Sequence, residues 1–177
     1  MKVGTKSLIF GVHSVIWHPL TVLFAWVHLY GLPNYREVLC IFIHDWGYFG
    51  CADMDDEEGS MHPELAGKIA RKFFGVTYGD LCLYHSRRYS ECQGKLPSRL
   101  CYADKLSIAY DPMWLYLLRA NLTGELPMYR EASDTHGMFP RDRSNKEWFI
   151  WLRAHMVEIG NSGAELSRCG YSTVLRH

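Results

Sequence analysis

The chain has 177 residues, of which 48% are hydrophobic and 21% are charged, with 19 basic and 19 acidic side chains. These values are ordinary for a soluble globular protein that is long enough to bury a proper core. The balanced charge argues against general nucleic-acid binding, which normally requires a basic excess. We expect residues 1–177 to form a single domain. An oligomer is compatible with the sequence, which does not determine the oligomeric state.

The longest stretch without a charged residue lies between Lys6 and Arg36 and is long enough to span a bilayer. Three histidines, Pro19 and the Gly31-Leu-Pro33 segment interrupt it. A membrane span rarely carries that polar load, and no small-residue cleavage site of a signal peptide follows. We therefore interpret it as two short pieces, the second a buried helix, and expect no membrane contact.

The six cysteines are scattered, without a CxxC pair. This pattern favours free thiols over a disulfide framework or a zinc site, and it indicates the cytoplasm as the compartment.

Hydrophobic spacing predicts helices, because no segment shows the sustained alternation of a strand. Pro19 suits the first turn of a helix that ends at Gly31, and Asn34 and Ser60 are candidate N-caps for the next two. With no repeat and no linker, we expect an all-α fold, a single-domain helical bundle. Its predicted helices are residues 19–30, 34–45, 61–74, 80–91, 98–110, 113–121 and 145–159, with loops at 47–60 and 133–144.

The most informative motif is the pair His44-Asp45, which follows the apolar run that begins at Ile41. Burying an imidazole and a carboxylate together costs several kcal/mol unless a cation or strong partners compensate. Adjacent residues on a helix point about 100° apart. Further ligands must therefore come from neighbouring helices, which is how helical bundles build internal metal sites.

Suitable ligands are spread along the chain, each on a separate predicted helix. His18 lies 26 positions before His44, His62 lies 18 after it, His85 lies 23 further on and Asp104 another 19. His13 is an alternative to His18, which we favour because Pro19 begins a helix whose first turn aims His18 inward. Imidazoles with a shared carboxylate suit manganese, iron, cobalt, nickel or zinc better than calcium.

Candidate phosphate contacts lie directly beside two of these ligands. Ser86, Arg87 and Arg88 follow His85, and Lys105 follows Asp104. Cations at such positions spread the charge that develops on a phosphate ester bound to a divalent metal. The alternative interpretation is a solvated basic helix face.

The loop after the metal pair is acidic, and one of its carboxylates is a candidate for positioning water or protonating a leaving group. Solvated charge is the alternative for each of them. They are Asp53, Asp55, Asp56, Glu57 and Glu58.

The aromatic residues near the C-terminal end, Trp148, Phe149 and Trp151, are expected in the core, and His155 is given no role.

The order of these residues resembles the HD-domain superfamily of metal-dependent phosphohydrolases, named for their His-Asp pair. The segment from His62 to Gly67, His-Pro-Glu-Leu-Ala-Gly, is also similar to one in its two-metal cyclic-dinucleotide phosphodiesterase branch. That branch usually has paired histidines and a Gly-Tyr-Pro motif where this chain has Tyr84-His-Ser-Arg87. The resemblance covers about half of the chain. It implies that His18, His44, Asp45 and Asp104 bind a first metal, and that His62 and His85, with Asp45 bridging, bind a second.

The resemblance implies an enzyme that hydrolyses a phosphate ester or anhydride, most plausibly in a nucleotide, by means of one or two divalent transition-metal ions. Its small phosphorylated substrate would contact Ser86, Arg87 and Lys105, while Asp45, Arg87 and Lys105 serve the reaction. The alternative is a diiron oxygenase on the same scaffold, cleaving a C–C or C–P bond of a small polar substrate. Metal content and oxygen dependence distinguish the two.

Overall fold

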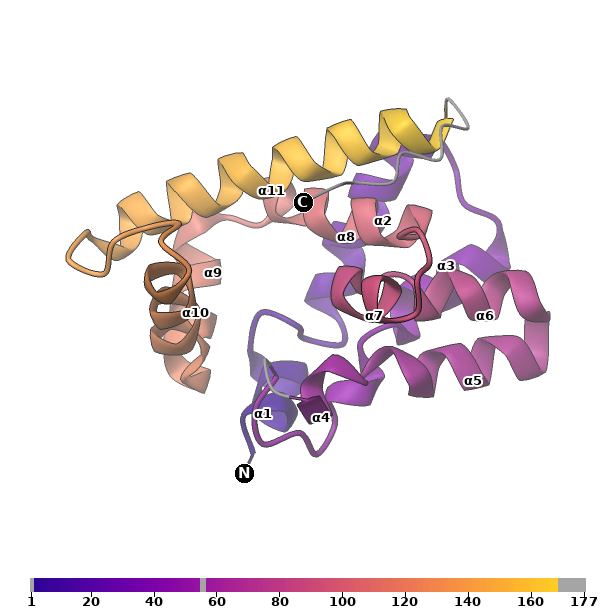
Figure 1. Ribbon diagram of the computed structural model, residues 1–177, viewed down its shortest axis with the longest axis horizontal. Coiled ribbons are helices and arrows are strands. Elements are labelled where there is room, and N and C mark those ends of the chain that lie inside the picture. The colour runs from indigo at the N-terminus through magenta and orange to yellow at the C-terminus, as the bar shows by residue number, and fades with distance from the viewer. Residues whose placement is uncertain (1, 55–56, 169–177) are drawn as a thin grey trace.

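The computed structural model describes residues 2–54 and 57–168, and every regular element in these ranges is helical, which confirms the all-α helical bundle (Figure 1). The elements in chain order are α1 (Val3–Phe10), α2 (Trp17–Tyr30), α3 (Tyr35–Ile43), the 3₁₀ turn η1 (Trp46–Tyr48), α4 (Glu57–Ser60), α5 (Pro63–Phe74), α6 (Val76–Leu83), α7 (Arg87–Cys92), α8 (Arg99–Leu106), the 3₁₀ turn η2 (Ser107–Tyr110), α9 (Met113–Thr123), α10 (Glu125–Thr135) and α11 (Asn145–Arg168).

The uncharged N-terminal stretch divides as predicted. α1 ends at Phe10, and α2 carries Pro19 in its first turn and ends before Gly31, whose φ of 81° suits glycine. Buried residues of α2 include Val22, Ala25 and Trp26. No helix in the described ranges has the length and apolar composition needed to cross a bilayer.

α3 begins with the predicted cap. The Asn34 side chain accepts the backbone N–H groups of Arg36 and Glu37, and the Glu37 carboxylate accepts the Asn34 N–H in return. This reciprocal capping box satisfies donors that a helix start leaves unpaired. Glu37 also accepts a hydrogen bond of 2.7 Å from Arg99, so the start of α3 is tied to the start of α8.

One predicted helix ends earlier than expected and another is interrupted, and both differences affect the candidate metal site. α3 stops at Ile43, so His44 and Asp45 follow the helix instead of lying on it. The predicted helix 80–91 is two helices, α6 and α7, with His85 in the turn between them. In that turn the Ser86 side chain accepts the Tyr89 N–H and begins α7 as its N-cap.

Other boundaries also differ from the prediction. Ser60 closes the short helix α4, and His62 instead precedes Pro63 at the start of α5. The predicted loop 47–60 contains η1 and α4, and the predicted helix 98–110 changes to a 3₁₀ turn after Leu106. α11 is longer than predicted, and α10 was missed because its breakers Gly124 and Pro127 lie at its N-terminal end, where they are tolerated.

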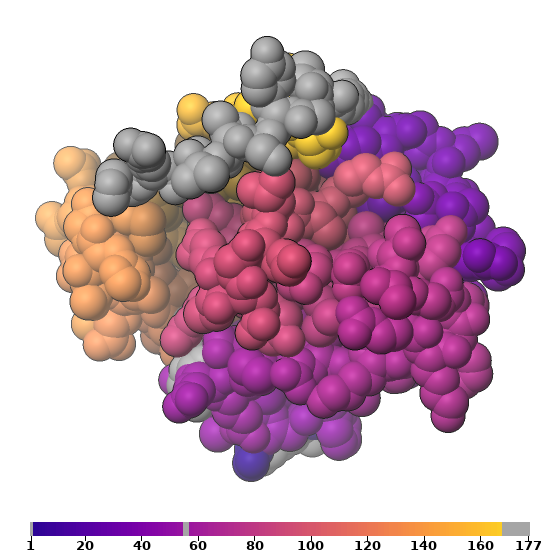
Figure 2. Space-filling view, turned by 45° about the vertical axis from the view of Figure 1, so that its right-hand side comes forward, coloured from indigo at the N-terminus to yellow at the C-terminus, as the bar shows by residue number. Residues whose placement is uncertain are grey.

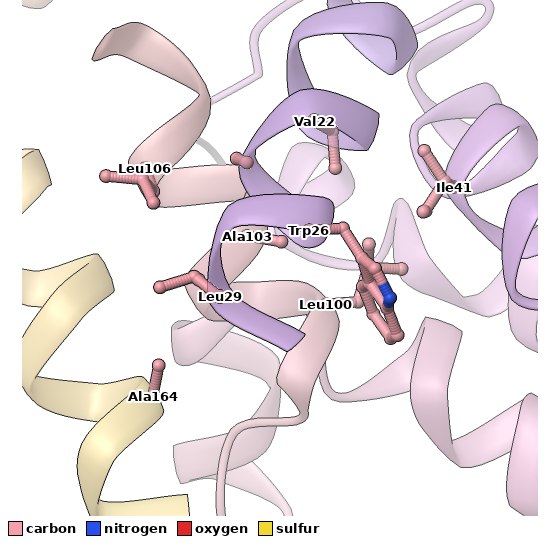
Figure 3. Packing of buried hydrophobic residues seen from close by; sticks show 9 residues of the cluster. Val22, Trp26, Leu29, Ile41, Leu100, Ala103, Leu106 and Ala164 are labelled. Atoms are coloured by element: carbon pink, nitrogen blue, oxygen red, sulfur yellow. The ribbon is translucent and has the colours of Figure 1, made fainter. Parts of the chain in front are cut away.

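Three buried apolar clusters hold the helices in place. The first joins α2, α3, α8 and α11 around Trp26, Ile41 and Leu100 (Figure 3). The second joins α9, α10 and α11 around Trp148 and Phe149, and the third joins α3, α5 and α6 around Cys40, Ala66 and Cys82. The first and third clusters share α3, so the end of that helix is fixed from both sides.

α11 lies along one side of the molecule, across α9 and α8 (Figure 1). It approaches α8 closely at Gly160 and Gly163, where an added Cβ would meet Leu106 and the ring of Tyr102. In the space-filling view, the central segments of the chain, coloured magenta to pink, form most of one face, with the orange residues around the start of α11 at its edge (Figure 2).

Candidate metal centre

The six predicted ligands come from five places in the chain and lie in contact with one another. His18 is in the first turn of α2, and Asp104 is in α8. The other four stand where helices begin or end, which lets their side chains converge without the 100° separation of a continuous helix. They are His44 and Asp45 after α3, His62 before α5 and His85 after α6.

The first set of ligand atoms surrounds one oxygen of Asp45. Its Oδ2 lies 3.3 Å from the Nε2 atoms of both His18 and His44. Asp104 Oδ1 lies 3.0 Å from His18 Nε2 and 3.9 Å from His44 Nε2. Metal–nitrogen bonds of about 2.0–2.1 Å place two ligands of one ion roughly 3 Å apart, so these four side chains suit a single ion.

The second set surrounds the other oxygen of the same carboxylate. Asp45 Oδ1 lies 3.3 Å from His85 Nε2 and 3.7 Å from His62 Nε2, and the two Nε2 atoms are 3.0 Å apart. Ligand atoms of His44, Asp45 and His85 also lie within 4.8 Å of one another, so the two sets adjoin. Asp45 therefore stands between two groups of imidazoles, one for each of its oxygens.

The backbone determines which nitrogen of three of these rings is available. The Nδ1 atoms of His44 and His62 each lie 2.7 Å from the carbonyl oxygens of Ile41 and Gly59, and His85 Nδ1 lies 2.5 Å from that of Cys82. A carbonyl oxygen only accepts, so each Nδ1 carries the hydrogen and donates it. Each neutral ring then presents an Nε2 lone pair to the centre, which is the form that binds metals.

Some of these inward-facing atoms make no hydrogen bond. Within the described ranges, His44 Nε2 and Asp45 Oδ2 are buried and unsatisfied. The lone pairs of His62 and His85 also face each other across 3.0 Å. Unpaired buried polar groups are costly, and facing lone pairs repel unless a cation lies between them. The donor set therefore fits metal binding.

The electrostatics keep two of the ligands, Asp45 and His62, in metal-binding forms. Burial alone would raise the pKa of Asp45, but His44, His18 and His85 hold it well below its usual range. Burial and the neighbouring His85 lower the pKa of His62 to about 3. An ionised carboxylate and a neutral imidazole are the species that coordinate metals.

His18 and Asp104 form a charge pair at the edge of this centre. Burial would lower the pKa of His18, but Asp104 and Asp45 outweigh it and raise the pKa to about 9. Burial alone would raise the pKa of Asp104, but Lys105 and His18 hold that pKa well below its usual range.

The choice between His13 and His18 is clear in the geometry. His13 Nδ1 lies 3.0 Å from Ser7 Oγ and 3.4 Å from Glu125 Oε1, away from the two carboxylates of the centre. Its ring centroid is 5.6 Å from that of His18, which itself stands between Asp45 and Asp104. His13 thus borders the centre and does not belong to its ligand set.

A cleft of about 480 Å³ opens beside the centre, and His18 and Asp104 lie in its wall. His13, Tyr48, Arg87 and Lys105 also line the cleft. Tyr48 stacks on the His62 ring, with centroids 3.9 Å apart and planes 15° apart. This stacking of Tyr48 on His62 could not be predicted from the sequence, where the only sign of it is that Tyr48 lies four residues after His44.

The predicted phosphate contacts take different positions. Arg87 is exposed at the start of α7 and lines the cleft. Lys105 also lines it, but its Nζ lies 2.8 Å from Asp104 Oδ2, so it supports a ligand as well as facing the cleft. Ser86 is used as the cap of α7 and does not belong to the residues that line the cleft in the described structure.

The acidic loop is described only in part. Asp55 and Asp56 lie outside the described residues. The Glu58 carboxylate accepts the Ala52 N–H at 3.4 Å, which gives it a role within the loop, and Glu57 is exposed.

Gly47 determines how closely the His44-Asp45 turn approaches α5. A Cβ at this position would meet the backbone carbonyl group of His62. Gly47→Ala is therefore expected to destabilise the fold by about 1–3 kcal/mol, the usual cost of overpacking, and to weaken metal binding by moving His62. Thermal unfolding and metal titration measure both effects. Phe49→Ala, at a side chain that is 73% exposed, is the control, and an equal loss in both variants would contradict the role of Gly47.

Comparisons with protein-family models, curated proteins and solved structures find no match to this chain. The functional interpretation therefore depends on the residues themselves and on their geometry.

Proposed function

We propose that this protein is a metal-dependent phosphohydrolase with two divalent transition-metal ions held on either side of Asp45. One observation carries the proposal. Each oxygen of this single carboxylate faces its own group of imidazole Nε2 atoms, and cationic side chains line the adjoining cleft. Two-metal hydrolases hold their ions about 3.5–4 Å apart, which is the separation that a bridging carboxylate permits.

The metal ions would lower the pKa of a bound water and polarise a phosphoryl oxygen. His18, His44, Asp45 and Asp104 would hold the first ion, and His62, His85 and Asp45 the second. Carbonyl oxygens behind three of the imidazoles keep those rings fixed in the required orientation.

The cleft supports an anionic substrate. Arg87 is exposed and lines the cleft, so its guanidinium can reach phosphate oxygens there. Lys105 adds positive charge beside Asp104, and both cations would counter the charge that develops on phosphorus in the transition state. We propose a small phosphorylated substrate, a nucleotide or a related ester or anhydride.

The test is phosphate release from a panel of nucleotides and simple phosphate esters. The metal-free protein is loaded in turn with manganese, cobalt, nickel, iron or zinc. The proposal predicts metal-dependent phosphate release without oxygen consumption. Turnover that requires iron and oxygen and releases no phosphate would overturn it and favour the diiron oxygenase.

Removing the second set of ligands should leave one ion in place. The double variant His62→Ala/His85→Ala is expected to bind one ion per chain where the natural chain binds two, because the first set keeps all four of its ligands. Elemental analysis after removal of loosely bound metal measures the ratio. The double variant Cys92→Ala/His136→Ala, at exposed residues, is the control. An unchanged ratio in the ligand variant would contradict the second site.

A further inference from the structure

Two chemically different groups of residues line the cleft beside the metal centre. The first group is polar and charged and includes His18, Asp104, Arg87 and Lys105; we call it the first end. The lining residues of α10 and α11, which we call the second end, belong to helices that contribute nothing to the ligand set. A substrate whose phosphate contacts the first group would place its organic part against the second.

One face of α11 forms the wall of this second end. Its lining residues recur at the spacing of a single helical face: Trp148, Trp151, Leu152, His155, Met156 and Ile159. The rings of Trp151 and His155 are parallel, with planes 8° apart and centroids 5.7 Å apart. On α10, Tyr129, Ala132 and Ser133 also line the cleft, again at positions of one helical face.

Three polar side chains that line the cleft, Ser133, Tyr129 and Asp111, are engaged within the protein. Ser133 Oγ accepts the Trp148 Nε1–H at 3.1 Å and donates to the Tyr129 carbonyl oxygen at 2.7 Å. The Tyr129 hydroxyl donates to Glu125 at 3.2 Å. Asp111 is paired with Arg119 and also accepts the Trp17 Nε1–H.

Amide side chains are absent from the cleft lining over the described ranges. Amides, which commonly recognise the edges of bases, therefore make no contribution from the described residues. Aromatic faces and thioethers remain, and both favour contact with a flat π-system.

We propose that this end of the cleft is a subsite for a planar aromatic group attached to the phosphate, bound by stacking and apolar contact. The proposal rests on the proposed function only for the placement of the phosphate at the metal end. A nucleobase and a simple aryl group share this chemistry. In both cases the face of the ring is recognised and its edge is not, so selectivity among aromatic rings should be low.

Binding of non-hydrolysable ligands to the metal-loaded protein tests the subsite without requiring turnover. Phenylphosphonate is expected to bind about 10- to 100-fold more tightly than methylphosphonate, because only its ring buries apolar surface against α11. Among nucleotides, adenosine, guanosine, cytidine and uridine 5′-monophosphates should differ by less than about 10-fold. Ribose 5-phosphate, which lacks a base, should bind at least about 10-fold more weakly than any of them.

Two variants of α11 probe the wall directly. Trp151→Leu keeps an apolar side chain but removes the flat surface, and Met156→Gln puts an amide where a thioether stood. Both should reduce the preference for phenylphosphonate over methylphosphonate by about 5-fold or more and leave methylphosphonate affinity unchanged. Ile150→Ala, at an exposed residue on the other face of the same helix, is the matched control and should preserve the preference.

The outcomes separate this subsite from the proposed function. Tighter binding of phenylphosphonate that Trp151→Leu removes supports the subsite even if no phosphate ester is hydrolysed. Equal affinities for the two phosphonates would overturn it even if the protein is an active phosphohydrolase. Discrimination of more than about 100-fold among the four nucleotides would also overturn it, because that selectivity requires recognition of base edges. A preference for the nucleotides over phenylphosphonate would identify a base as the natural occupant, and the reverse would identify an aryl group.

Discussion

Asp45→Ala should remove both metal ions and abolish turnover while the protein stays helical. This carboxylate presents one oxygen to each set of imidazoles, with its oxygens 3.3 Å from His18, His44 and His85 Nε2. Loss of groups that merely orient a ligand costs about 10–100-fold in metal affinity, so losing the shared ligand should cost more than about 100-fold. Calorimetric metal titration, phosphate release and circular dichroism measure the three effects.

Two further variants make this result specific. Asp142→Ala removes a carboxylate from an exposed position and should retain full metal content and turnover. Asp45→Asn keeps the shape of the side chain but removes its charge, and it should lose metal nearly as severely as Asp45→Ala. Full occupancy and normal turnover in Asp45→Ala would exclude Asp45 as the shared ligand.

Arg87→Ala should weaken catalysis far more than metal binding. Its guanidinium lines the cleft at the start of α7, outside the ligand set. A guanidinium holds phosphate through two parallel charge-assisted hydrogen bonds, which contribute about 1.5–3 kcal/mol each. A free energy of 1.36 kcal/mol corresponds to a factor of ten in rate. We therefore expect kcat/KM to fall by about 10- to 100-fold if one of these hydrogen bonds is lost, and by more if both are lost. The measurement compares kcat/KM at equal metal occupancy.

The neighbouring arginine provides a matched control. Arg88 follows Arg87 on the same helix and is equally exposed, but it does not belong to the described residues that line the cleft. Arg88→Ala should therefore change kcat/KM little. Arg87→Lys should recover part of the activity, because an ammonium keeps the charge without the two-pronged geometry. Equal effects at both arginines would show that α7 acts through its general charge.

The helical content and the position of α3 could be predicted because they depend on local chemistry. Gly31 ends one helix and Asn34 begins the next with a capping box, and both signals are visible in the sequence. The interruption of the predicted helix 80–91 at His85 could not be predicted from the sequence. It depends on Ser86 capping a new helix and on the Tyr84 carbonyl oxygen accepting the Ser98 N–H from a distant segment. Tertiary contacts of this kind override local propensity.

The candidate site was predictable in its residue types but not in its arrangement. The residues His18, His44, Asp45 and Asp104 could be proposed from type and order, and the resemblance implied that Asp45 bridges two ions. The structure adds which groups each oxygen of Asp45 faces. Lys105 was a candidate phosphate contact, with a solvated helix face as the alternative, and its pairing with Asp104 was not foreseen. Trp151 and His155 were missed because helical spacing cannot distinguish a core face from a cleft wall, although Trp148 and Phe149 are buried in the core as expected.

Anomalous diffraction from crystals of the metal-loaded protein tests the central claim most directly. Data collected above the absorption edge of the bound metal locate each ion without assumptions about its ligands. Two peaks about 3.5–4 Å apart are expected, one beside each oxygen of Asp45. The first should contact His18, His44 and Asp104, and the second His62 and His85. A single peak, or two peaks of which only one contacts Asp45, would rule out a two-metal site bridged by Asp45.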